Sequence, residues 1–241
     1  MEETLVAQLL EEVASYGIFC DEGAARRMIG HLLLVIEKNK VVNLTRITDP
    51  TEAVTLHCLD SILPLAVEGV ASRSFSSFLD LGTGAGFPGI PFGIMTGSAG
   101  VLIDSVGKKV AAVSEFIDVL GLDNLHAEHV RVEDYAARKP GSCDLVLARA
   151  VAQSNVLVEY ASPLLARHGL LVVEKGRPDD SELEAARRAA DLCGMRLVRQ
   201  HGFELPRELG HREILVFEKV GKPRLKLPRR VGVAKHEPLG I

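Results

Sequence analysis

The chain has 241 residues, of which 47% are hydrophobic and 25% are charged. These proportions are typical of globular domains, so they exclude a disordered or fibrous chain, and the length is sufficient for a substantial core. No apolar run reaches the ~18 residues of a membrane helix, and the first residues are acidic rather than basic. We therefore expect a cytoplasmic protein that has no membrane contact.

The formal net charge of -4 is distributed unevenly. Residues 219–241 hold seven Lys or Arg and one Glu, a net charge of +6, whereas residues 1–218 hold 21 basic and 31 acidic side chains, a net charge of -10. Lys and Arg that neutralise phosphates supply the sequence-independent part of nucleic-acid binding. The basic tail is therefore a candidate RNA contact, although a solvated terminus would explain its charge equally well.

The first part of the chain carries helical patterns. Apolar residues recur at helical spacing over residues 5–13 and again over residues 28–36, and Asp49-Pro50 is a helix start followed by apolar residues up to Leu63. These patterns predict a helical region over residues 1–70.

From Ser77 onward, short β-rich segments alternate with helical segments. We predict strands at residues 77–81, 100–105, 125–132, 143–149 and 169–176, and the alternation indicates a parallel, doubly wound, Rossmann-like α/β sheet. Residues 195–205 and 212–220 are separated by a turn too short for a crossover helix, which predicts a closing antiparallel hairpin. We assign residues 71–220 to this domain and residues 221–241 to the basic tail.

The segment from Phe78 to Gly89, FLDLGTGAGFPG, is a buried strand that leads into a glycine loop and a helix start. Glycines let the backbone turn sharply and approach a ligand, and free N–H groups at a helix start favour an anion. Asp104, eighteen residues after Gly86, ends the next predicted strand, where a carboxylate can accept both hydroxyls of a ribose. The pattern indicates a nucleotide-type cofactor site.

Two features favour S-adenosylmethionine (SAM) over a nicotinamide cofactor. Asp80 completes a D-x-G-x-G-x-G pattern, and an antiparallel closing hairpin is typical of class I SAM-dependent methyltransferases. An NAD(P)-dependent oxidoreductase remains the alternative enzyme, although no Tyr-x-x-x-Lys pair is present. A non-catalytic RNA-binding module is the other alternative, and it would not require the glycine loop.

Several segments, in order, resemble one family. They are residues 39–45 (NKVVNLT), 57–61 (HCLDS), the loop 80–89, residues 131–133 (RVE), residues 147–150 (LARA), and residues 228–232 (PRRVG) with Pro238-Leu239. From about residue 30 to the end, the chain resembles the 16S ribosomal RNA guanine-N7 methyltransferases, also known as glucose-inhibited division protein B. The resemblance implies a SAM-dependent enzyme whose partner is small-subunit ribosomal RNA or the subunit itself.

The resemblance also implies roles for particular residues. Gly82 and Phe87 would line the methionine end of SAM, Asp104 would hold the ribose, and Val132-Glu133 would border the adenine. Arg149 would lie where the cofactor meets the target base and is the candidate catalytic residue. The full cofactor-binding set is Asp80, Gly82, Gly84, Gly86, Phe87, Asp104, Val132, Glu133 and Arg149, and the RNA-binding set is Lys175, Arg229, Arg230 and Lys235.

The acceptor chemistry agrees with guanine N7. Residues 148–151 (ARAV), at the end of the fourth predicted strand, contain neither the N/D-P-P-Y/F loop typical of exocyclic-amine methylation nor a nucleophilic cysteine. Guanine N7 presents an unprotonated lone pair and needs no base. Arg149 or Lys175 could donate to the neighbouring guanine O6.

Two negative expectations complete the analysis. His57, Asp60 and Ser61 lie on one face of a predicted helix, and three helix neighbours cannot form the nucleophile–base–orienter line of a hydrolase. The four cysteines form no C-x-x-C pair, and no set of His and Cys has zinc-site spacing. We therefore expect buried free thiols and no metal. We also expect a monomer, although no sequence feature determines the oligomeric state.

Overall fold

A computed structural model describes residues 1–241. Its centre is a seven-stranded sheet with the order β3-β2-β1-β4-β5-β7-β6. Strands β1 to β5 are parallel, and β7 is antiparallel to both β5 and β6. The doubly wound sheet and its closing hairpin are therefore confirmed. The strands are β1 (Ser77–Leu81), β2 (Ala99–Asp104), β3 (Leu125–His129), β4 (Cys143–Arg149), β5 (Leu165–Lys175), β6 (Met195–Glu204) and β7 (His211–Lys219).

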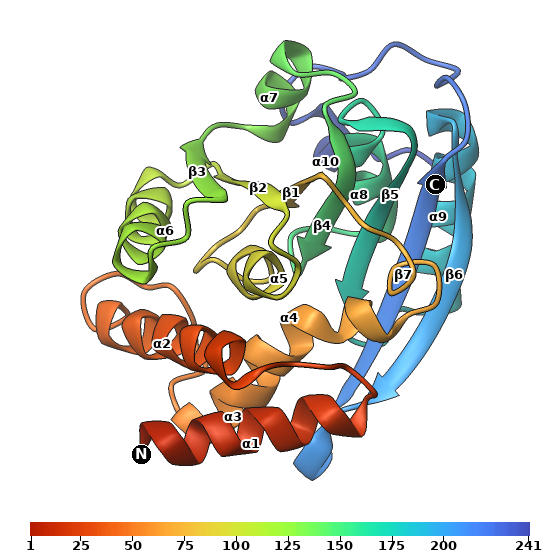
Figure 1. Cartoon of the computed structure of the whole chain (residues 1–241). Coiled ribbons are helices and arrows are strands. Elements are labelled where there is room, and N and C mark those ends of the chain that lie inside the picture. Colours follow the sequence, from red (N-terminus) through yellow and green to blue (C-terminus); the bar gives the residue numbers. More distant parts are fainter.

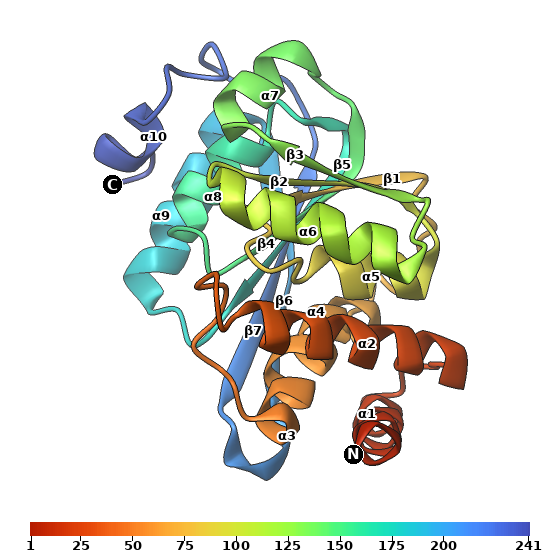
Figure 2. The same ribbon diagram turned by 90° about the vertical axis from the view of Figure 1, so that its left-hand side faces the viewer.

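Helices cover both faces of the sheet (Figure 2). One face carries the N-terminal helices together with α5 and α6, and these elements share a hydrophobic cluster of 42 buried residues with the sheet. The other face carries α7, α8, α9 and the tail helix α10 in a second cluster of 26 buried residues. The helices of the first face are α1 (Glu2–Ser15), α2 (Glu22–Lys38), α3 (Pro50–Ala53), the π-helical turn η1 (Val54–Leu59), α4 (Asp60–Ile62), the 3-10 turn η2 (Leu63–Ala66), α5 (Gly89–Thr96) and α6 (Gly107–Leu120). Those of the second face are α7 (Val132–Arg138), α8 (Ser154–Ala161), α9 (Asp180–Cys193) and α10 (Val233–His236).

The N-terminal helical region packs directly on the sheet (Figure 1). Leu9, Met28 and Leu59 are fully buried in the same cluster as Phe78 and Leu145 of the sheet. A helix of this region can bury its apolar stripe only against a neighbouring element, and the sheet face supplies that partner. The region predicted at residues 1–70 is thus a layer over one face of the sheet.

Local sequence signals set several helix starts. Asp21 caps α2 by accepting from the Ala24 N–H, and Asp49 caps α3 by accepting from the Glu52 N–H, with Pro50 in the first turn. The helix start expected at Asp49-Pro50 is confirmed. Its continuation differs from a regular α-helix, because η1 has π-helical hydrogen bonding and such turns are frequent at functional sites.

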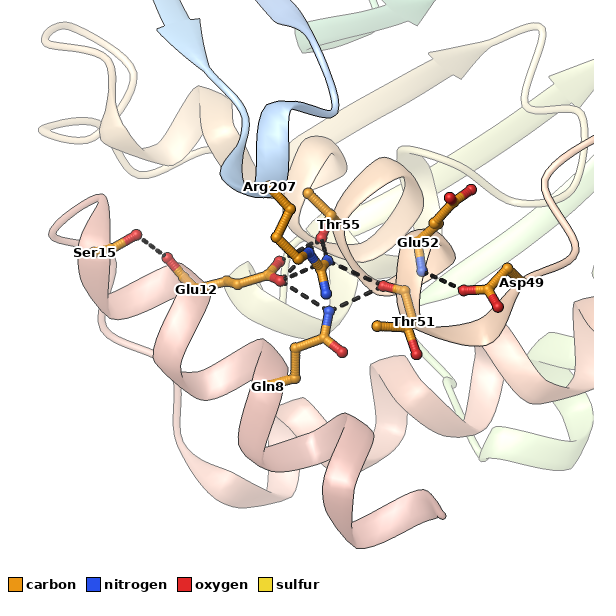
Figure 3. A network of polar contacts seen from close by, with 8 residues as sticks. All are labelled: Gln8, Glu12, Ser15, Asp49, Thr51, Glu52, Thr55 and Arg207. Atoms are coloured by element: carbon orange, nitrogen blue, oxygen red, sulfur yellow. Dashed lines mark hydrogen bonds and ion pairs between the residues drawn. The ribbon is translucent and has the colours of Figure 1, made fainter.

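The β6–β7 turn connects the hairpin to the N-terminal layer. Figure 3 shows Arg207 of this turn reaching Glu12 of α1 at 2.9 Å and hydrogen-bonding to Thr55. Glu12 is buried and also accepts from the Thr55 hydroxyl. A buried carboxylate needs such partners, so this contact holds the hairpin tip against α1 and η1.

Three details differ from the sequence-based expectations. The strand predicted at residues 125–132 ends at His129, because its partner β2 ends at Asp104, and Val132 already belongs to α7. All four cysteines are free, but Cys20 is only half-buried rather than buried. The basic tail is not a solvated terminus, since Ala234 is buried and the Arg224 N–H donates to the Leu192 carbonyl of α9.

Two searches of the structure gave negative findings. None of its helices is long and apolar enough to cross a membrane. No group of three or more His, Cys, Asp or Glu side chains is arranged to hold a metal ion.

Candidate functional site

The glycine loop between β1 and α5 adopts the backbone that its sequence requires. Gly82, Gly84 and Gly86 have φ values of +74°, +60° and +94°, a region that side chains with a Cβ rarely enter. A Cβ on Gly82 would lie 2.7 Å from Cγ2 of Val151. Glycine at this position therefore lets the loop pack closely against Val151, which follows the end of β4.

A cavity of about 330 Å³ opens beside this loop. It lies at the carboxyl ends of β1, β2 and β3, next to the point where the strand order reverses between β1 and β4. Ligands of doubly wound sheets bind at this point. The cavity is lined by Leu81, Gly82, Ile103, Asp104, Ser105, Lys109, Val130, Arg131, Val132, Glu133, Ala150, Val151, Tyr160, Gly232 and Lys235.

Four of the predicted cofactor residues line this cavity: Gly82, Asp104, Val132 and Glu133. Asp104 also holds the loop, because its Oδ2 accepts from the Gly84 N–H at 3.1 Å. Its Oδ1 accepts from the Val106 N–H at 2.9 Å. The remaining members of the predicted set do not line it: Asp80, Gly84, Gly86, Phe87 and Arg149.

Asp80 is buried beneath the loop. Its Oδ2 accepts from the Gly89 N–H at 2.9 Å, and its Oδ1 has no hydrogen-bond partner. Burial raises the pKa of this carboxyl to about 6. A carboxyl in this position shapes the loop and the start of α5 through its bond to the Gly89 N–H.

Phe87 faces the N-terminal helices. Its ring stacks on His57 with centroids 4.6 Å apart and lies 4.4 Å from His31. Burial lowers the pKa of both histidines to about 3, so both rings are neutral at neutral pH. His57 Nε2 lies 2.9 Å from the Thr45 hydroxyl, and the Ser61 hydroxyl donates to the His57 carbonyl. The structure thus gives His57 a packing role, and no hydrolytic set forms.

Arg149 ends β4 in a polar cluster with residues distant in sequence. Its Nη1 donates to Asp60 Oδ2 at 3.0 Å, and Arg212 Nε of β7 donates to the other oxygen of Asp60 at 2.5 Å. The Asp60 side chain is 2% exposed and that of Arg149 is 11% exposed. The Arg149 guanidinium also lies 5.6 Å from the centre of the Phe87 ring. Arg149 is therefore held on two sides, directly before Ala150, whose φ is +54°.

Glu174 completes this cluster from β5. It is paired in register with Arg149, and neither oxygen of its buried carboxyl has a hydrogen-bond partner. Burial raises its pKa well above the ordinary value, with the nearby Arg149 acting in the opposite direction. Sequence reasoning did not identify Arg212 or Glu174. The only sequence signal was their position at strand ends that meet at this edge of the sheet.

Lys175 lies on the opposite face of the sheet from Arg149. Neighbouring residues of a strand point to opposite faces, so Glu174 faces Arg149 while Lys175 faces α8 and α9. Lys175 Nζ pairs with Glu182 of α9 at 2.8 Å and donates to the Ala152 carbonyl. The sequence left either Arg149 or Lys175 as the donor to guanine O6, and the structure does not bring Lys175 to the site of Arg149.

The predicted RNA-binding residues of the tail differ in their surroundings. Arg229 forms a two-pronged ion pair with the buried Glu159 of α8, with contacts of 2.7 and 2.5 Å. Arg230 is exposed, and Lys235 is exposed at the rim of the cavity. Arg230 and Lys235 thus have free cationic groups, and Arg229 is engaged within the fold.

The strand order and the cavity at the reversal point define a class I methyltransferase fold. Solved structures support this class. The chain superimposes on the [4+2]-cyclase SpnF with a TM-score of 0.57 at 13% identity, covering 83% of this chain and 95% of that one. It matches a Burkholderia thailandensis 1,6-didemethyltoxoflavin-N1-methyltransferase, solved with S-adenosylhomocysteine, with a TM-score of 0.54 at 14% identity, covering 85% and 92%. At such identities these likenesses concern the fold alone.

Sequence relatives identify the family. The family model for rRNA small subunit methyltransferase G matches residues 25–210. Curated proteins named ribosomal RNA small subunit methyltransferase G include one from Lactobacillus helveticus, 37% identical over 85% of this chain and 87% of its own length. Another, from Lactobacillus johnsonii, is 35% identical over 95% and 97%. The chain belongs to the rRNA small subunit methyltransferase G family. These relatives give no support to the oxidoreductase or the non-catalytic RNA-binding alternative.

Proposed function

We propose that this chain transfers a methyl group from SAM to N7 of a guanine in small-subunit ribosomal RNA. The chain belongs to a methyltransferase family, and one observation of its structure carries the proposal. Gly82, Asp104 and Glu133 bound a cavity, and Asp60 fixes Arg149 directly before Ala150 of the cavity wall. When bound, SAM supplies an electrophilic methyl group on a sulfonium. The residues of the chain bind and orient the two reactants.

The cavity lining suits SAM. Gly82 and Val151 both line the cavity, and a Cβ on Gly82 would collide with Val151, so only glycine keeps this wall in its present form. This part of the loop is proposed for the methionine end of SAM. Each oxygen of Asp104 accepts one backbone N–H and retains a further acceptor position, so the carboxylate can accept ribose hydroxyls. Val132 and Glu133, at the start of α7, are proposed to border the adenine.

Arg149 is proposed as the catalytic residue that orients the guanine. A guanidinium is a frequent donor to guanine O6, the atom beside N7. Arg149 is well suited to this task because Asp60 and the Phe87 ring fix its position. In-line displacement depends mainly on holding the nucleophile at near-attack distance.

No base is required by this mechanism. Guanine N7 carries an unprotonated lone pair, and His57, which stacks on Phe87, is buried and neutral. We therefore expect the single-turnover rate to be flat above about pH 7, unlike the bell-shaped profile of general acid–base catalysis. A rise in rate there that is absent in His57→Ala would contradict this mechanism.

We further propose that the exposed tail cations, with Arg230 and Lys235 foremost, contact RNA phosphates. The tail carries seven of the basic residues of a chain that is otherwise acidic. We also propose that the protein acts in the cytoplasm, in keeping with a ribosomal RNA substrate, and that it acts as a monomer.

The product identifies the reaction. Purified protein is incubated with SAM and either naked 16S RNA or 30S subunits, and the nucleosides are analysed by mass spectrometry. We expect 7-methylguanosine from wild type and a strongly reduced yield from Arg149→Lys, which keeps the charge but loses the planar two-pronged donor. A methyl group on an exocyclic nitrogen would overturn the acceptor assignment even if SAM binds.

A salt titration tests the RNA contacts. Each phosphate contact adds roughly 0.7–0.9 to the slope of log affinity against log salt concentration. We expect Arg230→Ala to lower the slope by about one such step. Arg229→Met serves as the comparison, because Arg229 is paired with Glu159 and should change protein stability more than the slope.

A further inference from the structure

The C-terminal tail supplies part of the wall of the cofactor cavity. Gly232 and Lys235 lie among the residues that line it, together with Gly82 of the glycine loop. The family match covers residues 25–210, so the tail lies outside the matched part of the chain. Its role must be argued from its contacts.

The tail is fixed to the second face of the sheet by several contacts. Arg229 pairs with Glu159 of α8, whose side chain is 3% exposed. Farther along, Asn155 Nδ2 donates to the Leu239 carbonyl at 2.7 Å and Arg188 Nε donates to the Gly240 carbonyl at 2.6 Å. Ala234 lies in the hydrophobic cluster with α8 and α9. These contacts place residues 229–240 against the body as an ordered segment.

One hydrogen bond connects the tail to the cavity wall. The Gly232 N–H donates to Glu133 Oε1 at 2.9 Å, and Glu133 lines the cavity at the start of α7. Gly232 has a φ of +86°, so a residue with a Cβ would strain the backbone at this contact. Between the two anchors at Arg229 and Leu239, the tail therefore passes over the same wall that Val132 and Glu133 form.

We propose that residues 229–240 are a working part of the cofactor site, in which Gly232 holds Glu133 and Lys235 covers the rim. This inference rests on the proposed function, because it takes the cavity to be the SAM site. A cofactor that contacts this wall stabilises the docked tail, and by thermodynamic reciprocity the docked tail strengthens cofactor binding to the same extent.

Lys235 separates this role from RNA binding. It lines the cavity together with Arg131 and Lys109, whereas Lys226, another exposed tail lysine, does not. A role confined to RNA predicts equal effects of the two lysines on RNA affinity and no effect on cofactor affinity. A role in the cofactor site predicts an effect of Lys235 alone when RNA is absent.

The experiment measures binding of S-adenosylhomocysteine by calorimetry without RNA. Wild type is compared with a chain that ends at Lys226, for which we expect Kd to rise about tenfold or more. Lys235→Ala should raise Kd less, and Lys226→Ala should leave it unchanged. Unchanged affinity in the truncated chain overturns the inference.

Gly232→Ala provides a test that does not remove the tail. Its matched control is Gly97→Ala, since Gly97 also has a positive φ but lies at the end of α5. A new Cβ would meet no atom within 4 Å at Gly97 and only His236 Cδ2, at 3.8 Å, at Gly232. We expect weaker ligand affinity only in Gly232→Ala, and equal affinity in both variants overturns the inference.

Hydrogen exchange gives a second readout. The ligand should slow amide exchange over residues 229–240 of wild type, and unchanged exchange there overturns the inference. Failure of wild type itself to bind the ligand would instead overturn the proposed function, and this inference with it.

Discussion

Asp60 is the residue on which the position of Arg149 depends most directly. Its two oxygens accept from Arg149 at 3.0 Å and from Arg212 at 2.5 Å, and its side chain is 2% exposed. Asp60→Asn keeps the shape of the side chain but removes the charge, and one of the two guanidiniums then faces an amide N–H group. Two neighbouring, partly buried cations thereby lose the carboxylate that they share.

The size of the effect follows from these contacts. Hydrogen bonds to charged groups contribute about 1.5–3 kcal/mol each, and the Asn carbonyl retains one weaker bond. We expect the free energy of unfolding to fall by about 3 kcal/mol, within the range for breaking a buried ion pair. For a chain of this length, that loss lowers Tm by about 6–12 °C.

The same variant separates orientation of the base from cofactor binding. Misplacement of Arg149 should lower the single-turnover methylation rate about 100-fold. Affinity for S-adenosylhomocysteine should remain unchanged, because Asp60 does not line the cavity. Urea unfolding, single-turnover methylation and calorimetry measure the three quantities.

Asp144→Asn is the matched control. Asp144 accepts from Ser76 and Ser77 near the start of β4 and is not buried, so this variant should lose less than about 1.5 kcal/mol and methylate normally. If Asp60→Asn unfolds within about 0.5 kcal/mol of wild type, or methylates at the wild-type rate, Asp60 does not hold Arg149 as argued.

Three further predictions concern the acid response, the loop and Lys175. His31 and His57 have folded pKa values of about 3, so the unfolded chain alone takes up their protons below pH ~6.5, and stability falls by up to about 1.4 kcal/mol per pH unit for each histidine. Asp80, with a pKa raised to about 6, opposes this loss between about pH 6 and 4. In urea unfolding, the free energy of unfolding of His57→Gln should depend less steeply on pH than that of wild type, and an equal dependence would contradict the burial argument. Gly82→Ala should weaken S-adenosylhomocysteine binding in calorimetry, because its Cβ would lie 2.7 Å from Val151. Gly97→Ala, where the new Cβ meets open space, should not weaken binding. Equal affinities in the two variants would show that the loop is not part of the cofactor site. Lys175→Met should lower stability through loss of the Glu182 pair and leave the methylation rate near wild type, whereas a large rate loss in a stable variant would return Lys175 to the base-binding site.

The sequence alone determined the frame of the molecule and the place of the proposed cofactor site. Strand and helix periodicities are local, and the five parallel strands and the closing hairpin formed as predicted. The conformations of Gly82, Gly84 and Gly86 are also local, since only glycine enters the positive-φ region without strain. Asp104 could be located because it ends the strand after the glycine loop.

The tertiary structure decided which side chains meet. Arg149, Asp60 and Arg212 are far apart in sequence. They form one cluster only because the end of β4 and the start of β7 lie on either side of β5, close to Asp60 of α4. Glu174 and Lys175 are neighbours in sequence, yet the pleat of β5 turns them to opposite faces. Charge composition identified the tail as basic. Only packing on α8 and α9 shows that Arg229 is engaged internally and that Gly232 reaches the cofactor cavity, because such pairings depend on how distant surfaces fit together.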